Sequence, residues 1–218
     1  FFKFSFLRAP YCLLYVYINK NLQTMNKLKK SDLLSLEEFN SNREQLREHV
    51  LTIKKDRKIQ IGKNVNVFFE NSDTVKFQVL EILKVKNKFE QNGIEEELAT
   101  YNSLIPDGTN LKATMLIEFP SEIIKKDKLS QLNNIENNVW LQVGENDRIF
   151  AVAVENSERA VKEKTSSLHF LCFEFSSLMI KDLQSGSTLF AGIDHPNYNV
   201  RTQEIPRTTS DSLAQDLV

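Results

Sequence analysis

The chain has 218 residues, of which 41% are hydrophobic and 26% are charged, and its formal net charge is −1. These values are typical of a globular protein and argue against a disordered chain. A near-neutral charge also argues against a protein that binds nucleic acid or anionic lipid. Two cysteines, Cys12 and Cys172, are too few for a disulfide framework or a zinc quartet, so a reducing, cytoplasmic setting is expected.

The first 24 residues differ in composition from the rest of the chain. They contain three cations and no acid, so the net charge without them changes from −1 to −4. Their apolar stretch, residues 11–18, is far shorter than the roughly 20 residues that span a bilayer, and no small-residue cleavage site follows it. We therefore expect residues 1–24 to be a non-native or disordered extension, and residues 25–218 to form a single domain that begins near Met25.

Hydrophobic periodicity divides this domain into short helices and strands. The first helix has a capping box, because Ser35 is followed three residues later by Glu38. In chain order, the sequence predicts a helix at 35–53, a hairpin of strands at 58–62 and 64–70, helices at 71–89 and 94–105, a type I turn at 105–108, a strand at 111–119 and a helix at 121–135. It then predicts a hairpin of strands at 139–144 and 148–155, a strand at 166–175, a helix at 176–186, a strand at 188–193, an edge strand at 199–205 and a final helix at 208–217.

Hairpins and helices are interspersed in this order without a regular alternation of strand, helix and strand. The order indicates an α+β fold, a single domain with a mixed, mainly antiparallel sheet and helices packed against it. One basic cluster stands out at the end of the first helix, and it contains Lys54, Lys55, Arg57 and Lys58. We expect these cations to complement the helix dipole there.

The stretch AGIDHPNY, residues 191–198, places an acid beside one of the three histidines of the chain. Pro196 disfavours a helical conformation at His195 and holds it extended at the end of a strand. Asp194 can bond the backbone that follows it, as in an Asx turn. A structural turn and a ligand site both explain this pattern, and the sequence leaves both open.

A metal site would need several ligands at one point. His169 and Cys172 are three residues apart on a predicted strand, so their side chains point to opposite faces and cannot bind the same ion. His169 and His195 meet if their strands are neighbours, and Asp194 or Glu118 then adds a carboxylate. Such a set would suit iron or zinc, and these two histidines are the candidate metal ligands.

Polar residues within apolar strands give the other candidates. Lys112 and Glu118 flank one apolar run, and Ser167 lies two residues before His169 on the same face of another. Nothing resembles a nucleophile elbow, the six glycines form no phosphate-binding loop, and Cys172 in its apolar strand is expected to be a small hydrophobic residue. Buried polar groups need partners, so these residues either form a satisfied core network or line a pocket.

The candidate pocket residues are therefore His169, His195, Asp194, Glu118, Lys112 and Ser167. The sequence assigns no catalytic residue and no cofactor. Whether the chain is an enzyme is also left open by these observations.

Several ordered segments are similar to a bacterial family known as a domain of unknown function, family 3501. They are YNSLIPDGTNLKATMLIEF, EKTSSLHFLCFEF and AGIDHPNY, with LSLEEF and FENSDTVKFQVLEIL nearer the start, and together they cover about residues 25–217. The chain departs from the expected family pattern at Ser103, where we expect Pro, and at Cys172, where we expect Arg. The resemblance implies no activity, but members are expected near rubrerythrin-like and iron–sulfur oxidoreductase proteins.

Two functions follow as hypotheses. The first is a cytoplasmic accessory or interaction protein in a redox or iron–sulfur setting, whose partners would be iron–sulfur oxidoreductase or rubrerythrin-like proteins and neither nucleic acid nor a membrane. The second is an enzyme or a protein that binds a small ligand or metal in a pocket around His169 and His195. The two hypotheses differ in whether the candidate side chains converge on one cavity.

Overall fold

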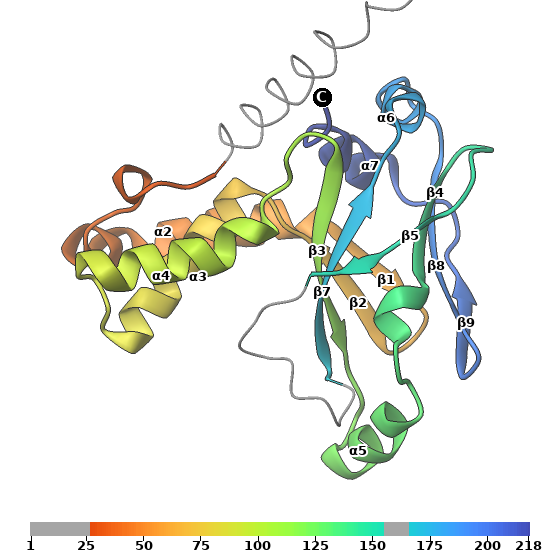
Figure 1. Cartoon of the computed structure of the whole chain (residues 1–218), viewed down its shortest axis with the longest axis horizontal. Helices are drawn as coiled ribbons and strands as arrows, with labels where there is room; N and C mark the ends of the chain where they lie inside the picture. Colours follow the sequence, from red (N-terminus) through yellow and green to blue (C-terminus); the bar gives the residue numbers. More distant parts are fainter. Residues whose placement is uncertain (1–26, 155–165) are drawn as a thin grey trace, which may run out of the picture.

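A computed structural model describes residues 27–154 and 166–218, so the expectation for residues 1–24 lies outside the described residues. Two antiparallel sheets face each other, and helices project from one side of them (Figure 1). In spatial order, sheet 1 contains β1 (Lys58–Ile61), β2 (Val65–Phe69), β3 (Asn110–Ile117), β7 (Leu168–Glu174) and β6 (Val152–Ala153). Sheet 2 contains β5 (Ile149–Phe150), β4 (Val139–Val143), β8 (Leu189–His195) and β9 (Tyr198–Arg201).

The helices lie between and beside these strands. They are η1 (Lys30–Asp32), α2 (Leu36–Lys55), α3 (Ser72–Lys86), α4 (Gln91–Tyr101), η2 (Asn102–Leu104), α5 (Glu122–Ser130), η3 (Ile135–Asn138), α6 (Ser177–Gln184) and α7 (Arg207–Ala214). The predicted α+β class and antiparallel pairing are confirmed, and the pairing divides the strands between two sheets. Within the described residues, no helix has the length and hydrophobicity to cross a bilayer.

The main core fills the space between the sheets. Strand β3 alternates along its length, so that Ala113, Met115 and Ile117 are buried against the inner face of sheet 2 while their neighbours point away. Leu183 of α6 and Leu213 of α7 belong to the same core. Burial of these alternating faces provides the main hydrophobic stabilisation of the two sheets.

The segment predicted as one strand, 148–155, is shared by the two sheets. Its first part, β5, pairs with β4 in sheet 2, and its second part, β6, pairs with β7 in sheet 1. Ala151 lies between them, is buried, and donates its N–H to the carbonyl of Val139 at 2.8 Å. The prediction of a single hairpin strand is wrong at this point, because the alternation of side chains is the same for a strand in either sheet.

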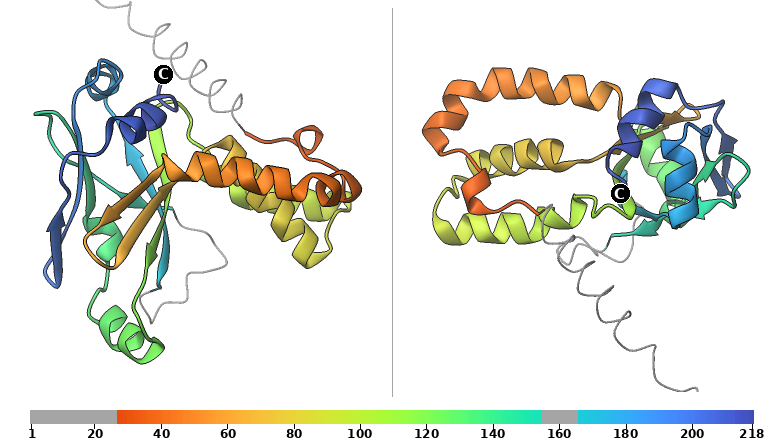
Figure 2. Two further views of the ribbon diagram at one scale, coloured as in Figure 1. Left: turned by 180° about the vertical axis from the view of Figure 1, so that it is seen from behind. Right: turned by 90° about the horizontal axis from the view of Figure 1, so that it is seen from above.

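Helices α2, α3 and α4 form a projection that we call the arm, and α3 lies between the other two in one layer (Figure 2). The predicted capping box at the start of α2 is present. Arg43 of α2 forms two hydrogen bonds with Glu81 of α3, at 2.7 and 3.1 Å. Lys86 of α3 contacts the buried Glu97 of α4 at 2.6 Å. Ion pairs thus link the middle helix of the arm to both neighbours.

Arg57 joins the base of the arm to the C-terminal part of the chain. Its guanidinium is buried and donates to the carbonyls of Phe69 and Ser212, each at 3.0 Å, and of Glu70 at 3.1 Å. It also forms an ion pair with Asp216, whose pKa is raised by burial and lowered by Arg57, with a net increase. The sequence pattern did not predict this buried role of Arg57, because its acidic partner is distant in the sequence.

Candidate functional site

His195 ends β8 as a buried side chain with both ring nitrogens occupied. Its Nδ1 accepts the N–H of Asn197 at 3.1 Å, so Nε2 carries the proton and donates to the carbonyl of Asn133, also at 3.1 Å. A neutral imidazole satisfies both contacts. His195 therefore attaches the end of sheet 2 to the segment that precedes β4.

His169 contacts the same segment from sheet 1. Its Nδ1 lies 3.5 Å from Oε2 of Glu136, and its Nε2 lies 2.6 Å from the carbonyl of Ser166. We call residues 133–136 the bridging segment, because it contacts one imidazole from each sheet. The Glu136 Oε2 atom is buried and has no hydrogen-bond partner among the described residues. Both histidines thus help to position this segment.

Asp194 lies on the outer face of sheet 2 and holds the only tryptophan of the chain. The indole N–H of Trp140 donates to Asp194 Oδ1 at 2.8 Å, and Arg148 contacts Asp194 Oδ2 at 2.6 Å. The Arg148 guanidinium lies 4.1 Å from the centre of the Trp140 ring, as a cation–π pair. Gly192 pairs directly with Trp140, and a Cβ atom there would overlap the indole. Gly192 and Asp194 in the AGIDHPNY stretch therefore accommodate Trp140.

Lys112 lies on the outer face of sheet 1, directly opposite Cys172. Its Nζ donates to the Cys172 sulfur at 2.9 Å, and the thiol donates to Glu174 Oε1 at 3.0 Å. Burial is the main cause that raises the pKa of the Cys172 thiol to about 11; the hydrogen bond to Glu174 also raises it and Lys112 lowers it. Nearby, the buried carboxylate of Glu70 accepts hydrogen bonds from two hydroxyl groups, those of Thr74 at 2.6 Å and Thr114 at 2.7 Å.

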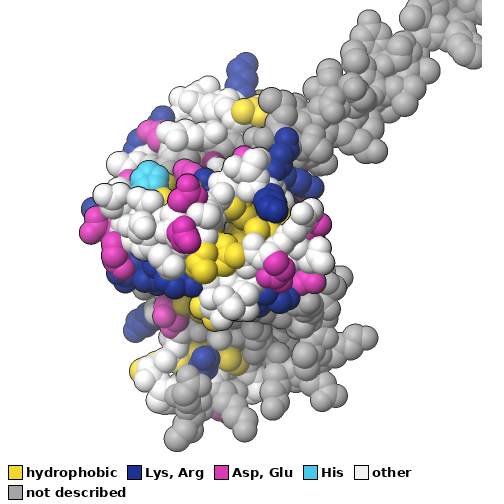
Figure 3. All heavy atoms as spheres, turned by 90° about the vertical axis from the view of Figure 1, so that its left-hand side faces the viewer, with side chains coloured by type: hydrophobic (Ala, Val, Ile, Leu, Met, Phe, Trp, Pro, Cys, Tyr) yellow, Lys and Arg dark blue, Asp and Glu magenta, His cyan; other side chains and the backbone are white. Residues whose placement is uncertain are grey.

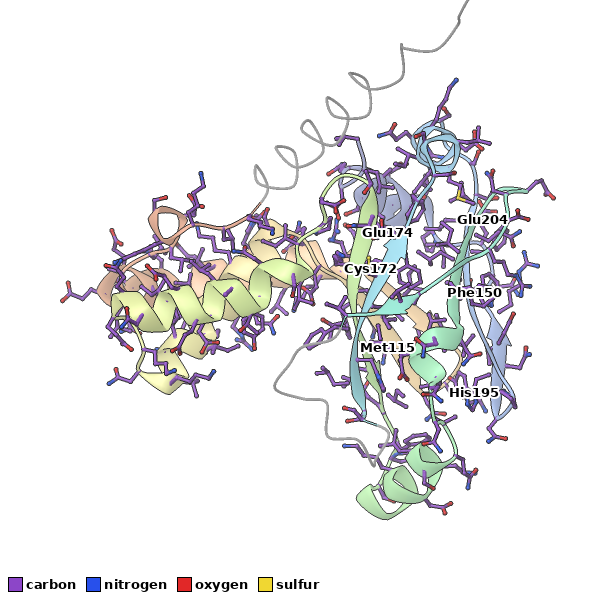
Figure 4. All side chains as sticks on the ribbon, viewed as in Figure 1. Met115, Phe150, Cys172, Glu174, His195 and Glu204 are labelled. Carbon is purple, nitrogen blue, oxygen red and sulfur yellow. The ribbon has the colours of Figure 1, made fainter. Side chains whose placement is uncertain are left out.

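The other two candidates have separate roles. Asn66 donates its side-chain amide to Glu118 Oε2 at 2.6 Å, and Ser167 contributes its backbone carbonyl to the N–H of Ile117 at 2.8 Å. Figure 4 shows Cys172 and Glu174 together on sheet 1, with His195 at a distance from them at the end of sheet 2. The six candidate residues therefore do not converge on one site. The bridging segment contacts two of them, His169 and His195, and the others have different polar partners.

Among the cavities bounded by described residues are two whose lining contains no candidate residue. One, of about 450 Å³, lies between the start of α3 and the C-terminal residues, and Asn71, Ser72 and Asp216 are among its lining residues. The other, of about 310 Å³, lies between β1 and residues 202–206, and we call it the edge groove. In the described part of the chain, no three His, Cys, Asp or Glu side chains come together in a way that would hold a metal ion.

The comparison with protein families identifies the group to which these features belong. The family model described as a protein of unknown function, DUF3501, matches residues 27–217. The chain belongs to this family. The matched residues contain both sheets and the arm described above, and the AGIDHPNY stretch that contacts Trp140 lies within them.

One solved structure resembles this DUF3501 chain over most of its length. It is described as a novel protein of unknown function from Burkholderia pseudomallei K96243, determined at 1.90 Å resolution. It has 38% sequence identity and a TM-score of 0.85, and the match covers 88% of this chain and all of the other. No curated protein matches the chain. The sequence analysis missed Trp140 and Arg148. The available signal was Gly192, two residues before Asp194, because a glycine within a strand often marks a place where a large side chain packs on the sheet.

The contact between Gly192 and Trp140 predicts a specific loss of stability. Gly192→Ala should lower the free energy of unfolding by about 1–3 kcal/mol, because the added methyl group overlaps the indole. In a Trp140→Phe background the same change should cost less, since the smaller ring leaves space, but it should still destabilise the protein because the added Cβ atom also lies 2.7 Å from the backbone carbonyl of Val200. Chemical denaturation of the four variants measures this coupling. Equal losses in both backgrounds would contradict the assigned contact.

The environment of Cys172 predicts slow reaction with iodoacetamide. In a Cys12→Ser background, the folded protein at pH 8 should react far more slowly than the urea-unfolded chain, because the thiol pKa is about 11 and the thiolate is the reactive form. The rate should rise as the pH approaches 11. Lys112→Met should slow the reaction further, since Lys112 lowers this pKa. Rapid labelling of the folded protein at pH 7 would exclude this environment.

Proposed function

We propose that this DUF3501 protein is an accessory protein that binds a partner protein through the end of its arm. The observation that carries the proposal is hydrophobic surface at this end. Figure 3 shows hydrophobic side chains gathered there and framed by charged ones. Val85, in the last turn of α3, is 83% exposed, and Ile82 and Phe89 nearby are only partly buried. An apolar surface with a polar rim is typical of a site that binds another protein.

The architecture of the arm supports the same proposal. Helices in a single layer bury the sides that touch a neighbour and leave the remaining faces to the solvent. The arm keeps its shape through ion pairs such as Arg43–Glu81 and Lys86–Glu97. A prearranged surface binds with a smaller loss of conformational entropy than a flexible one. The arm is thus suited to present its end to a partner.

The setting of this interaction is proposed from the family resemblance. We propose a cytoplasmic redox or iron–sulfur context, in which the partner is an iron–sulfur oxidoreductase or a rubrerythrin-like protein. Neither nucleic acid nor a membrane is proposed as a partner, because the formal net charge of the whole chain is only −1.

Affinity capture from an extract of the native cell tests this function. The wild-type chain should retain an iron–sulfur oxidoreductase or rubrerythrin-like protein, and Val85→Glu should reduce this retention by about tenfold, since it places a charge in the apolar surface. Leu178→Glu is the matched control, because Leu178 is 61% exposed on α6, away from the arm. Retention of no such partner, or equal losses with both variants, would refute the proposal.

A second candidate function is a small-ligand or metal site around His169 and His195, including an enzymatic one. The observation that favours it is that the bridging segment contacts both imidazoles. Metal binding would require one ring nitrogen of each histidine to leave its present partner. This candidate then predicts stoichiometric iron or zinc in protein purified with and without oxygen, and its loss in His169→Ala. Elemental analysis measures both, and protein free of transition metal under both conditions would eliminate the metal variant.

A further inference from the structure

Strand β1 is the outer strand of sheet 1, and part of its backbone points away from the sheet. Hydrogen bonds alternate along β2, where the N–H of Phe69 bonds to Arg57 and the N–H of Glu70 bonds to Lys112 of β3. The alternation directs Ile59 and Ile61 toward β2. The N–H and C=O groups of the intervening residues, Lys58 and Gln60, therefore face outward.

These outward groups open onto the edge groove. Lys58, Ile59 and Gln60 form one wall of this cavity of about 310 Å³, and residues 202–206, which continue from β9, form the other. Ile59 and Ile205 line the cavity and are 3% and 6% exposed, so their side chains provide an apolar floor between the two sheets. The groove thus combines unpaired strand backbone with an apolar base. An extended segment can use both at once, since alternate side chains of a strand point to opposite faces.

Charge indicates which kind of segment fits. The Lys58 side chain lies on the outer face of sheet 1, with its Nζ 5.5 Å from the centre of the Phe68 ring. Lys54 and Lys55 occupy the last turn of α2, immediately before this strand, and Lys55 is exposed. Glu204 lies on the opposite wall, toward sheet 2. A lysine on an edge strand normally discourages pairing with another strand, so a strand that pairs here must carry acidic side chains that offset the charge.

We propose that β1 binds an extended acidic segment of a partner protein, which pairs with Lys58 and Gln60 as an additional strand of sheet 1. Its apolar side chains would enter the groove over Ile59 and Ile205, and its alternate, acidic side chains would lie beside Lys58. This inference deepens the proposed function, because it gives the interaction protein a second contact with a defined chemistry. The contact is separate from the end of the arm, so each can fail without the other.

Two other occupants fit the groove less well. Residues 1–24 of this chain contain three cations and no acid, which is the wrong charge for a segment beside Lys58. A second copy that pairs β1 with β1 would bring another Lys58 to the same face, where the two like charges repel each other. Both occupants are distinguished from an acidic partner by the test below.

The test uses the full chain and a labelled synthetic peptide of alternating valine and glutamate as the probe. Fluorescence anisotropy should give binding at least about tenfold tighter than that of a matched peptide of alternating valine and lysine. Amide hydrogen exchange at Lys58 and Gln60 should slow when the acidic peptide binds. Gln60→Pro removes one outward N–H but no bond to β2, so it should weaken binding by about tenfold while the far-UV spectrum is retained.

A second variant tests the proposal by reversing the charge of Lys58, without introducing a proline into the strand. Lys58→Glu should reverse the preference between the two peptides, whereas Lys181→Glu, on the exposed surface of α6, should leave it unchanged. Val85→Glu should also leave peptide binding unchanged, which separates this inference from the arm. Equal binding of both peptides, or no effect of Lys58→Glu, would overturn the proposal. A dimer that Gln60→Pro dissociates would overturn the proposal in favour of a second copy of the chain. Stronger binding of the acidic peptide after deletion of residues 1–24, with no effect of Lys58→Glu, would overturn it in favour of that segment.

Discussion

The buried guanidinium of Arg57 connects the parts of this protein that the chain otherwise separates. It lies where α2 ends and β1 begins, and it contacts carbonyls at the end of β2, a carbonyl of α7 and the carboxylate of Asp216. A charge without water around it is tolerated only when hydrogen bonds and an opposite charge replace the solvent. Loss of one partner of such a pair typically costs about 3–5 kcal/mol, so the base of the arm and the C-terminal helix are energetically linked.

Several other polar side chains of the interior follow the same principle. His195 and His169 fix the bridging segment, Asp194 fixes an indole, and Glu70 is satisfied by two hydroxyl groups. In each case a polar atom is occupied by another part of the protein. Among the described residues, the apolar end of the arm and the outward backbone of β1 are two surfaces that these internal contacts leave available, and both are suited to binding another chain.

Local features of the fold were predictable from the sequence. The capping box at Ser35, the β1–β2 hairpin and the position of His195 at a strand end each depend on residues within a few positions of one another. Interactions between distant residues were not predictable in this way. Arg57 and Asp216 are 159 residues apart, and Gly192 meets Trp140 only because β4 and β8 pair. The candidate site has the same limit, since its residues were chosen one at a time and the groups that they contact lie elsewhere in the sequence.

The segment shared by the two sheets has a consequence for the length of the chain. Phe150 faces outward from sheet 2, Ala151 is buried, and Val152 faces outward from sheet 1. The outward side chains of β5 and β6 therefore match the outer faces of their sheets only because a single residue, Ala151, separates the two strands. An insertion or deletion of a single residue at this crossing would rotate one strand by half a period and turn an outward side chain into the core. Homologous chains should accordingly vary in sequence here, but keep this spacing constant.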